Sequence, residues 1–191
     1  MVGRWRAKQL EYSWTYTIMG LHPDFETLAE QALDWTMATL GLEDGQIRSA
    51  LLDEYARLSA HPDAEHCLRE VRGLGIPCAV LSNGSVETIK RVLVAARLAP
   101  LLDDVLSVER VGVFKPDPRV YRFAAAHLGV EPAELAFQTA NAWDAAGAAA
   151  AGLLVHWINR SAAPDEYGLR ASVAELQSLT ELAPRLSASR T

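Results

Sequence analysis

The sequence predicts an α/β fold, in which helices cover a parallel β-sheet and a helical segment precedes the sheet. Apolar residues recur at helical spacing through the first 60 residues. From His61 onward, short apolar runs alternate with amphipathic stretches, as they do in consecutive βαβ units. Polar residues follow several of these runs, where the carboxyl ends of parallel strands converge. We therefore expect a helical subdomain at residues 1–60 and an α/β core at residues 61–191.

Three helices are expected in the N-terminal segment. The first is unusually rich in aromatic residues, among them Trp5 and Tyr12. The second begins after Asp24, a favourable N-cap residue, and ends at Gly41. The third follows from the same apolar spacing over residues 47–58. Together these helices should form a small layer of their own.

The core should contain several strands that alternate with helices. Strands are predicted at residues 76–81, 105–108, 135–138 and 153–158. Helices are predicted around Cys67, around Ile89, and at residues 119–128, 142–151 and 173–182. Parallel crossovers are right-handed, so the polar groups at the strand ends should meet at one edge of the sheet. These groups are Ser82, Asn83, Lys115, Thr139, Asn141 and Asp144.

Composition narrows the classes of partner. Half of the 191 residues are hydrophobic and the net charge is -6, so we expect a well-buried globular protein without a basic surface for nucleic acid. No apolar run approaches the roughly 20 residues of a membrane span, and no secretory signal is recognisable. Cys67 and Cys78 are expected to be reduced structural thiols. These features indicate a cytoplasmic protein.

Residues 81–85, Leu-Ser-Asn-Gly-Ser, end the first predicted strand. Ser85 can cap the next helix, so free backbone N–H groups and the side chains of Ser82 and Asn83 would face one point, which suits an anion. An ordinary strand-to-helix turn, in which Asn83 and Gly84 serve only turn geometry, explains the same residues. The motif leaves both interpretations open.

Lys115 lies in a segment of restricted backbone. Pro116 favours an extended conformation for the lysine, while Asp117 and Pro118 have the pattern of an N-cap and a first helical residue. A lysine held in this way can pair with a carboxylate. A solvated lysine on a surface turn is the commoner alternative.

Residues 139–147 connect an apolar run to an Ala-rich helix. Asn141 fits the N-cap position, and Asp144 then falls at the third helical position. A carboxylate at that position can accept a hydrogen bond from the N-cap backbone N–H, and its charge interacts favourably with the helix dipole. Capping alone would explain both residues. Trp143 can belong to the core, or it can line a pocket beside an anion site with its indole N–H inside.

Read in order, these motifs resemble the landmarks of the L-2-haloacid dehalogenase branch of the haloacid dehalogenase superfamily. The matching blocks are residues 5–14, 81–85, 114–121, 141–145 and 157–160. The resemblance covers nearly the whole chain. It implies that the helical first third is the family's cap and that the remainder is its Rossmann-like core.

The resemblance implies a hydrolase that converts short (S)-2-haloalkanoic acids to (R)-2-hydroxy acids. In the family, an Asp at the end of the first core strand attacks C2 of the substrate with inversion, and water hydrolyses the resulting ester. The catalytic residues implied here are Arg6, Lys115, Thr139, Asn141 and Asp144. The residues implied to bind substrate or halide are Ser82, Asn83, Trp143, Tyr12, Leu10 and Tyr121.

Individual roles also follow from the resemblance. Arg6 would stabilise the departing halide with Asn83 and Trp143, and Ser82 would hold the substrate carboxylate. Lys115 would pair with the nucleophile and with Asp144, supported by Tyr121. The hydrolytic water would be positioned or activated by Asp144, Asn141 and Thr139. The last of these stands where the family often has Ser and keeps the hydroxyl.

The family's nucleophile motif is not recognisable in this sequence. In the family, an apolar strand ending in Asp-x-Tyr-Gly-Thr precedes the Trp-Arg helix, and this sequence starts at that helix. Asp24, Asp63 and Asp117 fit helix caps, and Asp103 and Asp104 precede a strand rather than end one. We therefore expect an N-terminally truncated enzyme that lacks the first core strand and is inactive as given. A non-catalytic remnant is the alternative.

No cofactor and no metal is expected. The superfamily's phosphatases keep an acidic motif for magnesium near the last site, whereas Asn141 replaces such an acid here and Asp144 stands alone. A phosphatase-like hydrolase is nevertheless the alternative enzyme class. Family members are often dimers, and the aromatic first helix would suit either a homodimer interface or packing on the cap.

Overall fold

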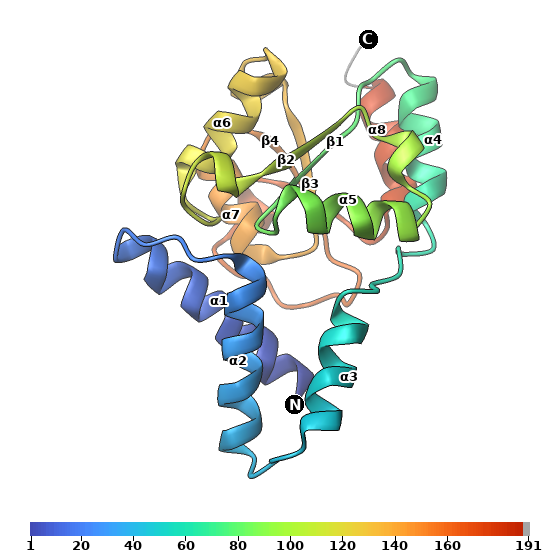
Figure 1. Ribbon diagram of the computed structural model, residues 1–191. Helices are drawn as coiled ribbons and strands as arrows, with labels where there is room; N and C mark the ends of the chain where they lie inside the picture. The colour runs from blue at the N-terminus through green and yellow to red at the C-terminus, as the bar shows by residue number, and fades with distance from the viewer. Residues whose placement is uncertain (189–191) are drawn as a thin grey trace. The chain divides into compact units, whose positions relative to one another are not determined.

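A computed structural model describes residues 1–188 of the chain (Figure 1). Its contacts divide the chain into two compact units. The first unit comprises residues 1–59, 81–99 and 105–114. The second comprises residues 60–80, 100–104 and those from 115 onward. The division into a cap at residues 1–60 and a core at residues 61–191 stays a prediction.

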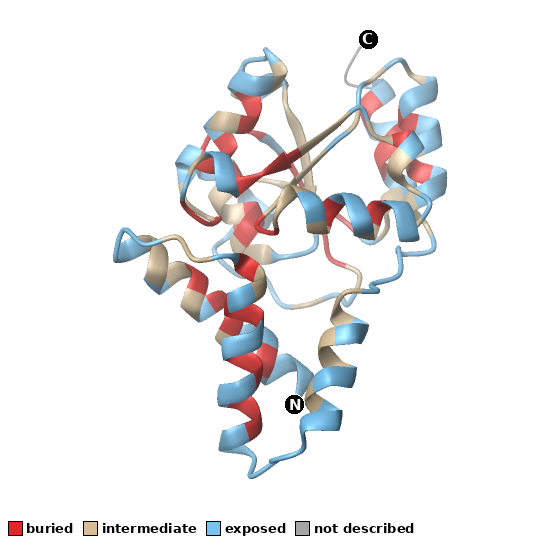
Figure 2. Cartoon of the chain, in the orientation of Figure 1, coloured by how far each residue is buried: buried red, intermediate tan, exposed pale blue. Residues whose placement is uncertain are grey.

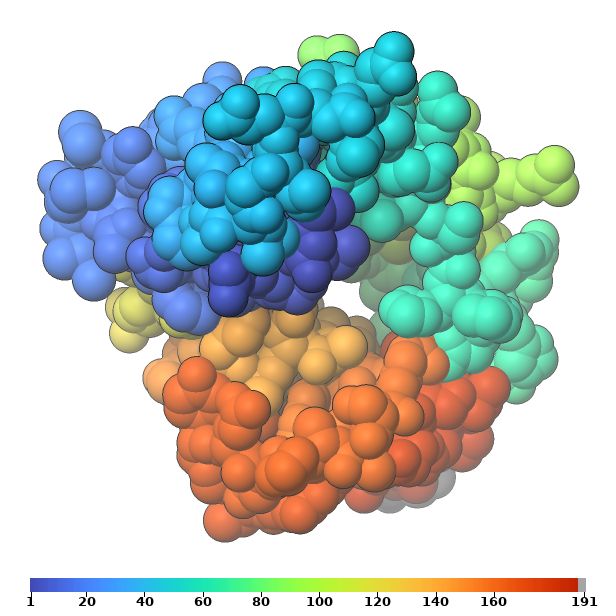
Figure 3. Space-filling view, turned by 90° about the horizontal axis from the view of Figure 1, so that it is seen from below, coloured from blue at the N-terminus to red at the C-terminus, as the bar shows by residue number. Residues whose placement is uncertain are grey.

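The three N-terminal helices are confirmed as α1 (Val2–Ile18), α2 (Phe25–Thr39) and α3 (Gly45–Tyr55), which are blue to cyan in Figures 1 and 3. α1 and α2 form a buried cluster of Trp5, Ala29, Ala32, Leu33 and Met37, and α3 packs partly buried side chains against it. The indole N–H of Trp5 donates to the carbonyl of Ala29 at 2.7 Å, which satisfies the polar atom of this buried side chain.

The first unit also contains α5 (Val86–Ala95), which presents buried Ile89 and Leu93 on one face. Ser85 caps this helix by accepting a hydrogen bond from the backbone N–H of Thr88 at 3.2 Å. The strands β1 (Ala79–Ser82) and β2 (Asp104–Ser107) pair with each other in a two-stranded sheet. The loop at the carboxyl end of β1 therefore leads directly into a capped helix.

The second unit is built on a parallel sheet of three strands in the order β3-β4-β5. The strands are β3 (Ala136–Thr139), β4 (Leu154–Ile158) and β5 (Ala174–Leu176). Its helices are α4 (Ala64–Gly73), α6 (Pro118–Leu128), α7 (Ala142–Ala150) and α8 (Leu182–Ala188). Since α7 connects two adjacent parallel strands, the predicted α/β class with βαβ connections is confirmed.

The helix predicted at residues 173–182 is wrong. Ala174–Leu176 instead forms β5, which pairs with β4 through the register His156 to Ala174 and Ile158 to Leu176. Leu176 is buried in a cluster with residues of α4 and α8, so its side chain and backbone both gain partners as a strand. This pairing outweighs the helix propensity of the local sequence.

The strands of the described residues form two sheets rather than one. Within residues 1–188, β3 pairs with β4 on one side and has no strand partner on the other. Buried residues make up most of β4 and one face of α2, whereas β1 has none (Figure 2). No helix in this part of the chain is both long and apolar enough to cross a membrane.

Candidate active site

The carboxylate of Asp144 is the centre of a buried hydrogen-bonded cluster in the second unit. Thr139 Oγ1 donates to Asp144 Oδ2 at 2.9 Å, and Lys115 Nζ donates to the same oxygen at 3.3 Å. The hydroxyl of Tyr121 donates to Oδ1 at 2.6 Å. All four side chains are buried. An ionised carboxylate can stay in such a place only because several donors replace its lost water.

Two segments of the chain, the β3–α7 connection and the start of α6, bring these four side chains together. Thr139 is the last residue of β3, and Asp144 lies in the first turn of α7, so one strand-to-helix connection supplies both. Lys115 precedes α6 and Tyr121 lies in that helix, whose start is fixed by Asp117 accepting from the N–H of Arg119. The carboxylate thus links the starts of two helices.

Close packing of α7 against the segment before α6 depends on Gly147. A Cβ atom at this position would lie 2.5 Å from Cβ of Pro116 and 2.9 Å from the hydroxyl oxygen of Tyr121. Both distances are below normal contact, and the proline cannot move as a flexible side chain would. Glycine therefore allows Tyr121 to reach the carboxylate of Asp144.

Burial shapes the protonation of the cluster. It lowers the pKa of Lys115, because desolvation disfavours the ammonium, and the charge of Asp144 opposes this only in part. Burial and the Asp144 charge both raise the pKa of Tyr121, so the phenol keeps its proton and remains a donor. The amine of Lys115 also lies 4.8 Å from the ring centroid of Phe137. This arrangement holds a cation that further negative charge would stabilise.

Capping does not explain Asp144. Asn141 occupies the N-cap position of α7, but its side chain makes no capping hydrogen bond. Its backbone N–H donates to Thr139 Oγ1 at 3.2 Å, while the side chain is exposed. The carboxylate of Asp144 is used by three side chains instead. Trp143, between the two, is half-buried.

The loop at residues 82–85 satisfies its own turn. Ser82 Oγ accepts from the N–H of Gly84 at 3.1 Å, and the hydroxyl of Ser107 donates to the carbonyl of Gly84 at 2.7 Å. Asn83 is buried. Turn geometry is thus one function of these residues, and it holds Ser82 and Asn83 in a defined place.

Two glutamate side chains of the chain itself accept hydrogen bonds at the start of α5. Glu26 Oε1 accepts from the N–H and the hydroxyl of Ser85 at 3.2 and 3.1 Å, and Glu109 accepts from the N–H of Val86 at 2.9 Å. Burial favours the neutral form of Glu26, but hydrogen bonds from Thr88 and Ser85 outweigh it and lower the pKa of this carboxyl. Both carboxylates therefore complement the helix dipole.

Arg6 is exposed on α1, yet its guanidinium is held in place. Its Nη1 donates to Gln9 Oε1 at 2.7 Å, and its Cζ lies 5.7 Å from the ring centroid of Phe25. Gln9 is buried, and its Nε2 donates to the carbonyl of Phe25 and to the hydroxyl of Tyr55. Gln9 and Phe25 therefore hold the positive charge of Arg6 in a fixed position.

A family model described as haloacid dehalogenase-like hydrolase matches residues 7–152. The chain belongs to this family. (S)-2-haloacid dehalogenase 1 of Pseudomonas sp. (strain CBS-3) is 44% identical over 179 residues, which cover 93% of this chain and 79% of that protein. The predicted resemblance to the L-2-haloacid dehalogenase branch is therefore confirmed.

Solved structures of haloacid dehalogenases share the fold. A crystal structure of a dehalogenase with an intermediate complex has a TM-score of 0.91 and 41% identity, and the match covers 95% of this chain and 80% of that chain. The L-2-haloacid dehalogenase of Xanthobacter autotrophicus with covalently bound chloropropionic acid has a TM-score of 0.86 and 33% identity, covering 96% and 84%.

In this member of the haloacid dehalogenase-like family, the predicted site residues fall into two groups. The second unit brings together Lys115, Tyr121, Thr139 and Asp144, with Asn141 and Trp143 on the same connection. The first unit holds the remaining ones. These are Arg6, Leu10, Tyr12, Ser82 and Asn83. Leu10 is buried, and Tyr12 packs against the cluster of the N-terminal helices.

Sequence reasoning missed Gln9 and Glu26. Gln9 lies one helical turn after Arg6, so its spacing could have indicated a contact on one face of α1. Glu26 is 59 residues from Ser85 and no local pattern connects the two. Only the tertiary structure reveals this second partnership.

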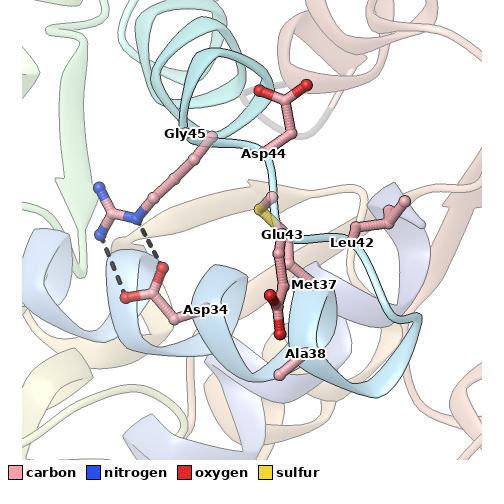
Figure 4. Close-up of a pocket in the computed structure, with 8 residues that line it drawn as sticks. Asp34, Met37, Ala38, Leu42, Glu43, Asp44 and Gly45 are labelled. Carbon is pink, nitrogen blue, oxygen red and sulfur yellow. Dashed lines mark hydrogen bonds and ion pairs between the residues drawn. The ribbon is translucent and has the colours of Figure 1, made fainter.

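A small surface hollow of about 280 Å³ lies between α2 and α3 and contains none of the predicted residues (Figure 4). Its Arg48 is paired with Asp34 and Glu30 at exposed positions, which is an ordinary surface ion-pair arrangement. Residues 1–188 contain no cluster of three or more His, Cys, Asp or Glu side chains suited to a metal ion. Both cysteines are free.

Proposed function

We propose that this chain supplies the binding and hydrolytic residues of an enzyme that converts short (S)-2-haloalkanoic acids to (R)-2-hydroxy acids. The buried cluster around Asp144 carries this proposal, because it places a multiply hydrogen-bonded carboxylate beside a buried lysine and a threonine hydroxyl. The names of the relatives support the same substrate class.

In the proposed reaction, a carboxylate attacks C2 of the haloacid from the side opposite the halogen. The carbon–oxygen bond forms as the carbon–halogen bond breaks, and the halide leaves with the bonding electron pair. Water then adds to the carbonyl carbon of the ester while Asp144 accepts its proton. Collapse of this adduct expels the alkoxide of the product, which takes the second proton of the water to become the 2-hydroxy acid, and the nucleophilic carboxylate is regenerated. Asp144 then releases its proton to solvent. Thr139 and Asn141 position the water.

Lys115 has an electrostatic role in this scheme. Its pKa is lowered by burial, and the carboxylate of Asp144 only partly offsets that effect. A second carboxylate beside the amine would stabilise the ammonium and would itself remain ionised as a nucleophile. Tyr121 keeps Asp144 oriented toward this group through the hydrogen bond at 2.6 Å.

The first unit is proposed to recognise the two ends of the substrate. Arg6 offers a cation to the departing halide, supported by Gln9 and by the ring of Phe25. Ser82 holds the substrate carboxylate, and Asn83 assists the halide. Leu10 and Tyr12 line the pocket for the short alkyl chain.

We further propose that the nucleophilic carboxylate comes from a segment outside residues 1–191. Asp63 pairs with Arg160, and Asp103 pairs with Arg72. Asp117 caps α6. The described residues also leave one side of β3 without a strand partner, which would accept another parallel strand.

Halide release from (S)-2-chloropropionate tests the function. The chain would be joined to the N-terminal segment of the Pseudomonas (strain CBS-3) relative, and the chain as given would be assayed beside it. We expect chloride and (R)-lactate from the joined protein only. Changing Asp144→Asn should leave an ester that accumulates and is visible by mass spectrometry.

A folded joined protein that releases no chloride would contradict the proposal. Cleavage of a generic phosphomonoester with magnesium would favour the phosphatase-like alternative instead.

The homodimer stays a prediction, and sedimentation of the chain measures its oligomeric state directly.

A further inference from the structure

Glu26 connects the N-terminal helices to the loop that carries Ser82 and Asn83. It lies in the first turn of α2, and its Oε1 accepts from both the N–H and the hydroxyl of Ser85. A Cβ atom built on Gly84 would lie 3.6 Å from the same oxygen. The carboxylate thus lies along the loop as well as at the start of α5.

Helix capping alone does not require this contact. Ser85 already caps α5 through Thr88, and Glu109 already satisfies the N–H of Val86. Glu109 follows β2, whereas Glu26 comes from a different helix that is distant in sequence. The additional bond from Glu26 therefore fixes the loop to α2.

The same turn of α2 also supports Arg6. The ring of Phe25 lies beneath the Arg6 guanidinium, and the carbonyl of Phe25 accepts from Gln9, which holds that guanidinium. Neighbouring residues of one helix therefore contact the support of Arg6 on one side and the Ser82–Asn83 loop on the other. A helical turn is rigid, so the two contacts are coupled.

We propose that Glu26 is a positioning residue, which sets the place of Ser82 and Asn83 relative to Arg6. This inference rests on the proposed function, because it assigns a fixed spacing to the groups that would bind the carboxylate and the halide of the substrate. Substrate binding should then depend on Glu26 although this side chain touches neither end of the substrate.

Hydrogen-bond donors keep Glu26 ionised although other carboxylates lie nearby. The carboxylates facing the start of α5 are those of Glu26 and Glu109, and Glu87 lies in the first turn of the helix itself. The helix dipole and the donors of Ser85 and Thr88 compensate this concentration of negative charge. Because the Ser85 donors to Glu26 are a neutral N–H and a neutral hydroxyl, replacing Glu26 removes one negative charge without removing the partner of a cation.

Hydrogen exchange of the chain as given tests the contact without any activity. Glu26→Ala should speed exchange of the Ser85 amide by about tenfold, because a hydrogen bond to a charged acceptor is lost. The matched control is Glu109→Ala, at the same helix end, which should speed exchange at Val86 and leave Ser85 unchanged. Unchanged Ser85 exchange in a folded Glu26→Ala variant would overturn the proposal.

Kinetics of the joined protein test the positioning role. Glu26→Ala should raise KM for (S)-2-chloropropionate by about fivefold or more while kcat changes less, since ground-state and transition-state binding are weakened together. Glu26→Gln keeps an acceptor oxygen and should restore part of the loss, and Glu109→Ala should leave KM unchanged. Equal KM values in the two alanine variants would show that Glu26 serves only as a helix cap and would overturn the proposal.

The two measurements separate the possible failures. Faster exchange at Ser85 in a joined protein that has no dehalogenase activity would contradict the proposed function and retain the loop contact. Normal exchange with an active enzyme would contradict the role of Glu26 and retain the function.

Discussion

The hydroxyl of Tyr121 and the carboxylate of Asp144 are joined by a buried hydrogen bond of 2.6 Å, shorter than the bonds that Thr139 and Lys115 make to the same carboxylate. Because burial and the Asp144 charge raise the pKa of Tyr121, the phenol keeps its proton and acts as a donor. The orientation of Asp144 therefore depends on a neutral donor as well as on a charged one.

Tyr121→Phe should lower the free energy of unfolding by about 1–3 kcal/mol, because one oxygen of a buried carboxylate loses its donor. The phenylalanine ring keeps the edge contact that Tyr121 makes with Phe137. Urea unfolding measures the change. Tyr167→Phe removes a hydroxyl from an exposed side chain and serves as the matched control. Equal stability of both variants would contradict this prediction.

Removing either partner of the Lys115–Asp144 pair should have unequal effects. Asp144→Ala leaves a buried amine and two hydroxyls without their acceptor, and should cost about 3 kcal/mol or more. Lys115→Met leaves the carboxylate with two donors and should cost less, about 1–2 kcal/mol. Chemical denaturation of both variants gives the order, with exposed Asp53→Ala as control. The opposite order would show that the lysine, not the carboxylate, organises the cluster.

Gly147→Ala should destabilise the protein by about 1–3 kcal/mol, because the added methyl overlaps Pro116 and the hydroxyl of Tyr121. Gly73→Ala, at the end of α4, meets no atom within 4 Å and should be neutral or slightly stabilising. Thermal unfolding of the two variants makes the comparison within one unit. A neutral Gly147→Ala would mean that the two helices can move apart freely.

Asp63→Asn should destabilise the second unit in a pH-dependent manner. Asp63 accepts two hydrogen bonds from Arg160, at 2.6 and 2.9 Å, and others from Ser178 and Leu179. The Arg160 contact above all holds the pKa of this carboxyl well below its usual value.

Because the folded pKa is the lower one, the stabilising contribution of Asp63 is complete above the unfolded value of about 3.9 and declines as the pH falls below it. The difference in unfolding free energy between wild type and Asp63→Asn should therefore be constant from pH 8 to 5 and shrink below about pH 4. Urea unfolding across this range measures it. A difference that grows toward acid would reverse the assigned sign.

The elements with clear local signals were predictable from the sequence. Proline and aspartate at residues 116–118 marked the start of α6, and the apolar run before Thr139 marked β3. The pairing of Lys115 with Asp144 came from the resemblance rather than from local pattern. The contact between Tyr121 and Asp144, which are 23 residues apart, was not predicted. Their contact also needs the space at Gly147.

Other features depended on tertiary contacts that no local pattern encodes. β5 was predicted as helix because its residues favour helix in isolation, whereas pairing with β4 makes them a strand. Asp63 was predicted as a cap, and it occupies the N-cap position of α4, but its side chain makes no capping bond and binds Arg160, 97 residues away. Long-range ion pairs of this kind are set by the fold.

The two carboxylates at the start of α5 have a consequence for discrimination between substrates. A helix N-terminus that is already occupied by Glu26 and Glu109 repels a further anion in proportion to its charge. In the proposed function, the haloacid that Ser82 would bind carries one negative charge, whereas a phosphomonoester near neutral pH carries close to two. The loop should therefore disfavour binding of dianions, so that Glu26 and Glu109 discriminate between substrates by their charge.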